Sequence, residues 1–286
     1  MRSDPRNSLE IQKFKMKIWL NGKFVEEEEA KVDITSSGFL YGQGVFETMR
    51  VYNERVFRLD SHLERLFKAL PVLNLELAVG PEVLKKAVKQ ALKENNLKDA
   101  YLRITVWQGK DGPEAAVFAK VHNFLTKEDY CKGFKVILST FRQNEFSILS
   151  GIKSANYLPL LLTYQEAKKK TADEAILLNT RDFLAEASRA NIFLVKDNCL
   201  LTPSLDCGCL PGITRDTVLG LAAKERIKVI ETKLKPEDIQ RADEAFLTNS
   251  LIEIIPLTTF EGRPVKKGFP GKITELILKR YRLLLQ

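Results

Sequence analysis

The chain has 286 residues, of which 44% are hydrophobic, and its 45 Lys and Arg exceed its 37 Asp and Glu to give a net charge of +8. This length and apolar content allow one large hydrophobic core or two smaller ones. No apolar run reaches the roughly 18 residues of a membrane span, and the basic residues are interleaved with acidic ones, which argues against a membrane protein and against a nucleic-acid-binding protein.

The first part of the chain predicts a small domain of strands and helices. Residues 1–14 are polar and charged and lack the apolar stretch of a secretory signal, so we expect a loose extension there. Asn21-Gly22 predicts a hairpin turn between two short strands. Ser61, followed three residues later by Glu64, is the expected N-cap of a helix. The other expected elements are a Gly-rich loop from residue 41 feeding a β-rich run over 45–51, a helix over 81–95, and strands over 100–107 and 115–124.

Residues 127–133 are charged, short and end in a glycine, which is typical of a linker between domains. The sequence thus predicts a small N-terminal α/β domain over 1–126 and a large C-terminal domain over 134–286. In the large domain we expect a strand over 134–139, a helix over 157–170, a meander over 175–201, a helix over 215–226, a strand over 245–248 and a C-terminal helix over 272–285.

The four cysteines do not predict a metal site. Cys207 and Cys209 are one residue apart, which is closer than a usual metal-binding pair, and the only histidines, His62 and His122, lie far away in sequence. We interpret the cysteines as loop thiols of a protein in the reducing cytoplasm.

Several stretches carry candidate chemistry. Gly212-Ile213-Thr214 precedes a helix, and its free backbone N–H groups could bind a phosphate, although a simple Thr-capped helix has the same pattern. Ser250 at a strand end and Arg65 within a helix could serve the same phosphate. Lys153 is a candidate catalytic amine, although most of the many basic residues will be solvated.

Five stretches in this order resemble the fold-type IV enzymes that use pyridoxal 5′-phosphate (PLP), that is, the class IV aminotransferases. They are residues 41–48, 62–66, 152–157, 186–191 and 210–216, and the Leu-Pro-Gly-Ile-Thr-Arg-Asp run is the most specific. The similarity extends from about Ile18 to Tyr281. It implies a two-domain α+β fold like that of D-amino-acid aminotransferase, with the active site at the domain interface.

The resemblance also implies the cofactor site. Lys153 would hold PLP as a Schiff base and move the substrate proton. Glu186 would face the pyridine nitrogen and keep it protonated, so that the ring accepts electrons. Five further residues would hold the cofactor: Arg65, Ile213, Thr214 and Ser250 at the phosphate and Tyr157 at the ring 3′-oxygen. From the sequence alone, Tyr157 could equally be a core aromatic residue.

Six residues stand at substrate positions of the family: Tyr41, Phe46, Thr48, Arg103, Asn249 and Leu251. The resemblance implies that Arg103 binds the substrate carboxylate, whereas the strand pattern alone would also allow a surface arginine. Tyr41 matches a position that reaches into the site of the partner subunit, so a homodimer is implied.

Departures from the family pattern leave the reaction subtype open. Ala187 and Arg189 replace the usual glycine and small residue after Glu186, and Gln43 replaces the usual aspartate. Thr48 and Asn249 resemble the pattern of aminodeoxychorismate lyases, although residues 110–113 do not match the arginine-bearing loop of that enzyme.

We therefore expect an aminotransferase that moves an amino group between an α-amino acid, with a branched-chain preference, and 2-oxoglutarate. The alternatives are 4-amino-4-deoxychorismate lyase, which releases pyruvate, and D-amino-acid aminotransferase. The D-specific alternative is less favoured because Trp107-Gln108 stands where those enzymes carry an arginine. The expected partners are small amino and keto acids and a second copy of the chain, in the cytoplasm, with no metal, nucleic acid or membrane.

Overall fold

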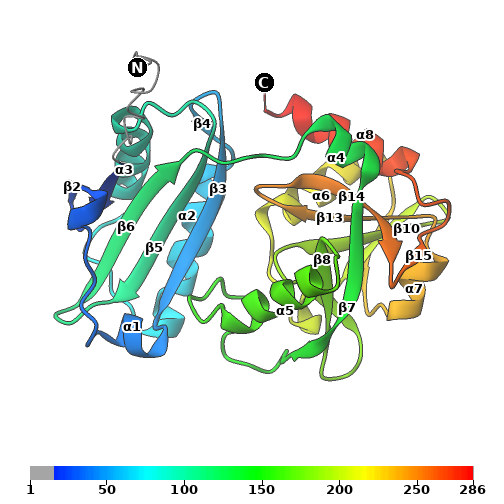
Figure 1. Cartoon of the computed structure of the whole chain (residues 1–286), viewed down its shortest axis with the longest axis horizontal. Helices are drawn as coiled ribbons and strands as arrows, with labels where there is room; N and C mark the ends of the chain where they lie inside the picture. The colour runs from blue at the N-terminus through cyan, green and yellow to red at the C-terminus, as the bar shows by residue number, and fades with distance from the viewer. Residues whose placement is uncertain (1–15, 286) are drawn as a thin grey trace, which may run out of the picture.

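The computed structural model describes residues 16–285 and contains two β-sheets with helices packed against them (Figure 1). The extension expected at residues 1–14 lies outside the described residues. The expected α+β class is confirmed: all strands of the first sheet precede residue 121 and all strands of the second follow residue 133. The division into domains at 127–133 stays a prediction, which this separation supports.

The first sheet has the strand order β2-β1-β6-β5-β3-β4. Two helices pack on one face of it, and their apolar residues Leu63, Leu66 and Leu84 form a core with Met49 and Val51 of β3 (Figure 1). The elements are β1 (Lys17–Leu20), β2 (Lys23–Glu26), η1 (Glu27–Glu29), α1 (Ser37–Tyr41), β3 (Gly44–Tyr52), β4 (Arg55–Val56), α2 (Leu59–Ala69), η2 (Pro71–Leu73), α3 (Pro81–Glu94), β5 (Ala100–Gln108) and β6 (Pro113–Lys120).

The second sheet has the strand order β12-β11-β10-β13-β14-β7-β8-β9, and β15 pairs with β14. Phe193 and Phe246 stack on the face covered by α6 and α8. The elements are α4 (Lys127–Lys132), β7 (Phe134–Gln143), α5 (Leu158–Lys169), β8 (Glu174–Asn179), β9 (Leu184–Ala187), β10 (Asn191–Lys196), β11 (Cys199–Pro203), η3 (Leu205–Cys207), α6 (Ile213–Lys224), β12 (Val229–Thr232), α7 (Pro236–Arg241), β13 (Glu244–Asn249), β14 (Glu253–Phe260), β15 (Arg263–Pro264) and α8 (Lys272–Leu283).

The stretch expected to be a linker contains a helix. Thr126 and Asp129 form a capping box that starts α4, because each side chain binds the backbone N–H of the other residue. The helix is anchored to the second sheet, since the Tyr130 hydroxyl donates to the Ile252 carbonyl oxygen at 3.1 Å and the Thr258 hydroxyl donates to the Lys132 carbonyl oxygen at 3.0 Å. Residues 121–126 carry the chain between the two sheets.

Two further expectations are wrong. Helix α2 begins at Leu59 rather than after Ser61, because the His62 N–H already donates to the Arg58 carbonyl oxygen, and Glu64 pairs with Lys68 instead of capping. The expected meander over 175–201 is interrupted: β8 pairs with β9, whereas β10 pairs with β11 and β13. In residues 16–285 no helix is long and apolar enough to cross a membrane.

Candidate active site

Lys153 lies on a segment that is hydrogen-bonded to the first sheet. The Phe46 N–H donates to the Lys153 carbonyl oxygen at 2.9 Å, and the Ala155 N–H donates to the Gly44 carbonyl oxygen at 2.8 Å. These two bonds attach the segment to β3 as a short antiparallel bridge. The Lys153 backbone is thereby fixed, and its Nζ lies 4.7 Å from the centroid of the Phe46 ring.

The amine of Lys153 has no carboxylate partner within the described part of the chain. Burial is the main cause that lowers the pKa of Lys153 to about 8, and the nearby Arg65 charge adds to it, while Glu47 and Glu186 oppose it. A lysine with this pKa is partly neutral near neutral pH. It can therefore act as a nucleophile and as a base.

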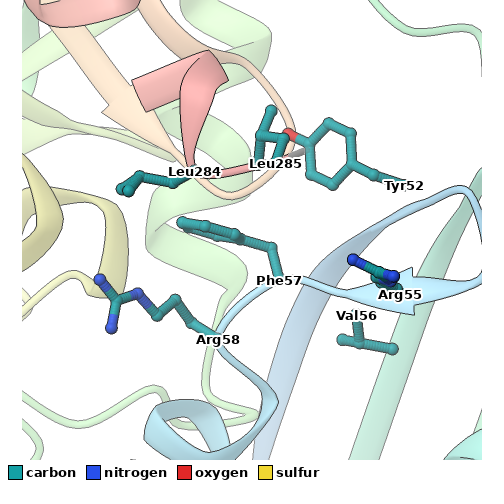
Figure 2. A pocket seen from close by; sticks show the side chains of 7 residues that line it. All are labelled: Tyr52, Arg55, Val56, Phe57, Arg58, Leu284 and Leu285. Atoms are coloured by element: carbon teal, nitrogen blue, oxygen red, sulfur yellow. The ribbon is translucent and has the colours of Figure 1, made fainter. Parts of the chain in front are cut away.

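A cavity of about 160 Å³ extends from Lys153 to α2 and to the loop before α6; its lining includes Phe46, Glu47, Arg65 and Pro211. A larger cavity, of about 350 Å³, lies between β4, the start of α2 and the end of α8 (Figure 2). None of the expected site residues lines the larger cavity. We place the candidate site at the smaller cavity, because buried groups with shifted pKa values meet there.

Arg65 is held by a buried carboxylate that the sequence did not single out. Its Nε and Nη2 donate to Glu47 at 2.8 and 2.7 Å, and its Nη1 donates to the Pro211 carbonyl oxygen at 2.9 Å. Burial alone would raise the pKa of Glu47, but Arg65 and the hydrogen bond with His62 hold it at about 2. Arg65 thus joins α2 to the loop before α6, in a fixed orientation.

His62 extends this network to the second sheet. Its Nδ1 lies 2.6 Å from Glu47 Oε2, and because an ionised carboxylate only accepts, Nδ1 carries the proton. Burial lowers the pKa of His62 although the Glu47 hydrogen bond opposes this, so the ring is neutral. Its unprotonated Nε2 lies 3.4 Å from the Ser250 hydroxyl, which donates to it.

Glu186 lies in β9, is buried, and accepts the Leu210 N–H at 3.0 Å. Burial raises the pKa of Glu186 to about 7, against the Leu210 hydrogen bond and the Lys153 charge. A cation placed beside this carboxyl group would lower its pKa again and favour the ionised form.

The start of α6 is a candidate anion site. Its N-cap residue is Gly212, which provides no side-chain hydrogen bond, so the first backbone N–H groups, including those of Ile213 and Thr214, lack acceptors within the helix. Asn191 Nδ2 donates to the Leu210 carbonyl oxygen at 2.8 Å, and a Cβ at Gly212 would overlap Asn191 Oδ1. A side chain at Gly212 would therefore displace the Asn191 amide that holds this loop against β10.

The Asn249 side chain stabilises the turn between β13 and β14 by hydrogen bonds. Its Oδ1 accepts the N–H groups of Leu251 and Ile252 at 2.8 and 2.9 Å, and its Nδ2 donates to the Arg189 carbonyl oxygen at 2.8 Å. The amide is thus used within the protein. A direct role for Asn249 and Leu251 at the substrate stays a prediction.

The aromatic rings of Phe46 and Tyr157 lie next to the Lys153 amine. The rings of Phe46 and Tyr157 meet edge to face at 5.3 Å, and the Tyr157 hydroxyl donates to the Ser188 carbonyl oxygen at 3.0 Å. The Arg103 guanidinium lies 3.8 Å from the centroid of the Phe46 ring, and its Nε donates to the Thr105 hydroxyl at 3.0 Å. In residues 16–285 Arg103 has no acidic partner, so its charge is available to an anion.

Two further expected substrate residues, Thr48 and Tyr41, lie in the first part of the chain. Thr48 is paired directly opposite Arg103 in the first sheet. Tyr41, at the end of α1, is 73% exposed.

Sequence reasoning missed the roles of Glu47 and His62. One signal was present: Glu47 lies within the apolar β-rich run of β3, where a carboxylate needs a buried partner. His62 and Arg65 are three residues apart on one helix, so both side chains lie on the same helix face, from which they could be the partners of the Glu47 carboxylate.

Comparison with known proteins agrees with this geometry. A family model described as amino-transferase class IV matches residues 44–260. The chain is 37% identical over 278 residues to a protein of Methanocaldococcus jannaschii named putative branched-chain-amino-acid aminotransferase, with 93% of this chain and 96% of that protein covered. The solved structure of Escherichia coli branched-chain amino acid aminotransferase is similar with a TM-score of 0.90 and 29% identity, covering 95% of each chain. A branched-chain amino acid aminotransferase of T.th., complexed with N-(5′-phosphopyridoxyl)-L-glutamate, is similar with a TM-score of 0.89 and 29% identity, covering 95% of this chain and 94% of that one.

Proposed function

We infer the reaction from one premise: the chain belongs to the class IV aminotransferases, so it is a PLP-dependent enzyme that transfers amino groups between small amino and keto acids. We propose that the amino donor is a branched-chain amino acid and that the acceptor is 2-oxoglutarate. The names of the similar proteins support the donor, and the phosphopyridoxyl-glutamate bound to the T.th. enzyme supports the acceptor.

Lys153 and Arg65, which line the smaller cavity, and candidate residues outside its lining together fit PLP. Lys153 offers an amine with a lowered pKa and no acidic partner in the described chain, and it would hold the cofactor covalently. The open start of α6 suits the phosphate, with the N–H groups of Ile213 and Thr214, Arg65 and the Ser250 hydroxyl around it. Tyr157 would lie at the ring 3′-oxygen. The observation that carries the proposal is the position of the Lys153 amine, which lines the cavity and has no acidic partner in the described chain.

When bound, PLP supplies an electron sink for the negative charge left on the substrate Cα. Glu186 would pair with the protonated ring nitrogen, which would keep this buried carboxyl ionised despite a pKa raised to about 7 by burial. The Lys153 amine, once released from the cofactor, would take the proton from the substrate Cα and deliver a proton to the cofactor carbon.

Arg103 and Phe46 would form the substrate side of the site. The uncompensated Arg103 charge would bind a substrate carboxylate, and the Phe46 ring, buried beside it, would contact an apolar side chain. Thr48, opposite Arg103, would contribute a polar group.

A homodimer and a cytoplasmic location are part of the proposal. Large apolar side chains are exposed on α1, on the segment before Lys153 and on α5: Phe39, Leu40, Tyr41, Phe146, Ile148, Leu158, Leu161 and Leu162. Exposed apolar residues in such number are typical of a subunit interface. The four free thiols suit a reducing compartment.

The pattern of Thr48 and Asn249 keeps aminodeoxychorismate lyase as the alternative, and D-amino-acid aminotransferase as a second one. Arg103 favours transfer, because it supplies a cation for an α-amino acid carboxylate. The test is the absorbance change of the PLP enzyme with a panel of L- and D-amino acids, beside an assay of pyruvate release from aminodeoxychorismate. Faster pyruvate release than transfer from any amino acid would replace the proposal with the lyase.

A further inference from the structure

Glu253, the first residue of β14, combines a backbone conformation suited to glycine with a buried carboxylate. Its φ is +55°, in the left-handed region that bulky residues rarely adopt. Glycine would adopt this conformation without strain, so the backbone does not account for a glutamate here. The residue is 3% exposed. A strained residue with a buried charge points to a role for the side chain.

The Glu253 carboxylate binds donors from two distant parts of the chain. Its Oε1 lies 3.1 Å from Arg50 Nη1 and accepts the Tyr52 hydroxyl at 3.2 Å, and both donors belong to β3 of the first sheet. Its Oε2 accepts Arg282 Nε, from α8, at 2.8 Å. The side chains of Glu253 and Arg50 are 4% and 14% exposed, so loss of the carboxylate would leave shielded donors without a partner.

Arg50 connects the same carboxylate to the turn before it. Arg50 Nη1 also donates to the Leu251 carbonyl oxygen at 3.2 Å, one residue after Ser250. The guanidinium lies 3.8 Å from the centroid of the Phe124 ring, and Phe124 belongs to the segment that carries the chain between the sheets. The Tyr52 ring lies beside the Arg50 guanidinium and lines the larger cavity (Figure 2). Strand β3, the connecting segment and the β13–β14 turn therefore meet at one ion pair.

We propose that the Arg50–Glu253 pair fixes the β13–β14 turn against β3, and that both are positioning residues for the cofactor phosphate. The two side chains proposed to bind the phosphate lie on opposite sides of the contact between β3 and the turn. Arg65 is held to β3 through Glu47, and Ser250 lies in the turn. The distance between Arg65 and Ser250 therefore depends on the position of the turn relative to β3. The inference rests on the proposed phosphate role of Arg65 and Ser250.

The test titrates PLP into the cofactor-free full-length protein. Glu253→Gln keeps the size and the strained backbone but removes the charge, whereas Glu253→Gly removes the side chain and relieves the strain. Both variants are expected to raise the Kd for PLP about tenfold or more. The control is Glu225→Gln, which removes a charge paired at 2.6 Å with Arg280 of α8. Glu225 is the C-cap residue of α6 and, among the described residues, does not pair with β3, so the Kd of this variant for PLP should stay within about twofold of the wild type. A Glu253→Gly protein that binds PLP as the wild type does would overturn the inference.

Amide hydrogen exchange of the cofactor-free proteins separates positioning from general destabilisation. In Glu253→Gln, exchange should accelerate over residues 249–253 and stay unchanged over β10. Uniform acceleration of all segments would mean that Glu253 only stabilises the fold. If the Glu253 variants do not fold, Tyr52→Phe removes a single donor and keeps both charges, and the Kd is expected to rise about threefold; an unchanged Kd would count against the proposal.

Arg65→Lys and Ser250→Ala belong in the same titration, because they test the premise. If both bind PLP as the wild type does, the proposed phosphate site is wrong. If they weaken PLP binding while both Glu253 variants do not, the phosphate site stands and only the positioning role of Glu253 is wrong.

Discussion

At the scale of single residues, Lys153 has the properties of a catalytic amine. It borders a cavity, it has no acidic partner in residues 16–285, and burial lowers its pKa to about 8 from the usual value of 10.5. The folded protein therefore gives up the lysine proton more readily than the unfolded chain does. Only the neutral amine can bond to an aldehyde carbon.

This pKa predicts how covalent attachment of PLP depends on pH. The rate of attachment to the cofactor-free enzyme should rise about tenfold for each pH unit below about 8 and level off above it, because the neutral fraction of Lys153 follows that course. Stopped-flow absorbance measures the rate. Borohydride reduction and mass spectrometry of the peptides should then find the phosphopyridoxyl group on Lys153. Attachment to another lysine, or a rate still rising well above about pH 9, would contradict the assignment.

Glu186 gives a prediction on the rate of the reaction. Glu186→Gln should slow amino-group transfer about a hundredfold, or about 3 kcal/mol, because a neutral amide no longer stabilises a protonated ring nitrogen. PLP should remain bound, since the glutamine oxygen can still accept the Leu210 N–H that fixes the neighbouring loop. Single-turnover absorbance measures the rate, and a PLP titration is the control. A rate equal to that of the wild type would show that Glu186 is not the partner of the ring.

The sequence predicted individual candidate site residues but not how they pair. Lys153, Glu186 and Arg65 lie in short motifs whose order along the chain carries the resemblance. The bonds of Arg65 to Glu47 and to the Pro211 carbonyl oxygen span 18 and 146 residues. A motif shows which residue types are present, whereas the folded chain decides which of them meet, so the buried Glu47 partner became apparent only in the structure.

At the scale of secondary-structure elements, long periodic segments were predictable and short ones were not. The helix over 81–95 and the C-terminal helix over 272–285 were found as α3 and α8, within two residues at each end. Helices α1 and α4 were missed because five and six residues show no helical period. The break between β9 and β10 was missed because strand partners distant in sequence, such as β13, leave no local signal.

Two glycines, the α6 N-cap residue Gly212 and Gly220 inside α6, lead to opposite predictions. Gly212→Ala should raise the Kd for PLP about tenfold or more, because the added Cβ overlaps Asn191 Oδ1 and displaces the open start of the helix. Gly220 is exposed within the same helix and has open space around it, so Gly220→Ala should stabilise the protein by about 0.5–1 kcal/mol and leave the Kd unchanged. A PLP titration and chemical denaturation measure the two effects. Equal PLP affinity in the two variants would refute the phosphate role of the α6 start.

At the scale of the whole molecule, the exposed apolar surface around Tyr41 lies next to the site rather than far from it. Tyr41 follows the exposed Phe39 and Leu40 on α1, and Gly42 after it accepts a hydrogen bond from Asn156 Nδ2 at 2.8 Å, three residues after Lys153. A second copy that covers this surface would therefore come close to the entrance of the site. In the sequence, only the family resemblance of Tyr41 implied a site shared between two subunits. The exposed apolar surface became apparent only in the structure, because exposure depends on how the chain folds.

A shared site predicts that two defective subunits can restore each other. Lys153→Ala lacks the amine, and Tyr41→Ala lacks the side chain proposed to reach the partner. In a mixed dimer, the site that keeps Lys153 receives an intact Tyr41 from its partner. Random pairing makes about half of the dimers mixed, with one complete site each, so co-expressed subunits should recover about a quarter of wild-type activity. Each variant alone should stay far below this value, and sedimentation should show dimers throughout. Co-expressed dimers that stay as inactive as the better single variant would show that Tyr41 does not act in the site of its partner.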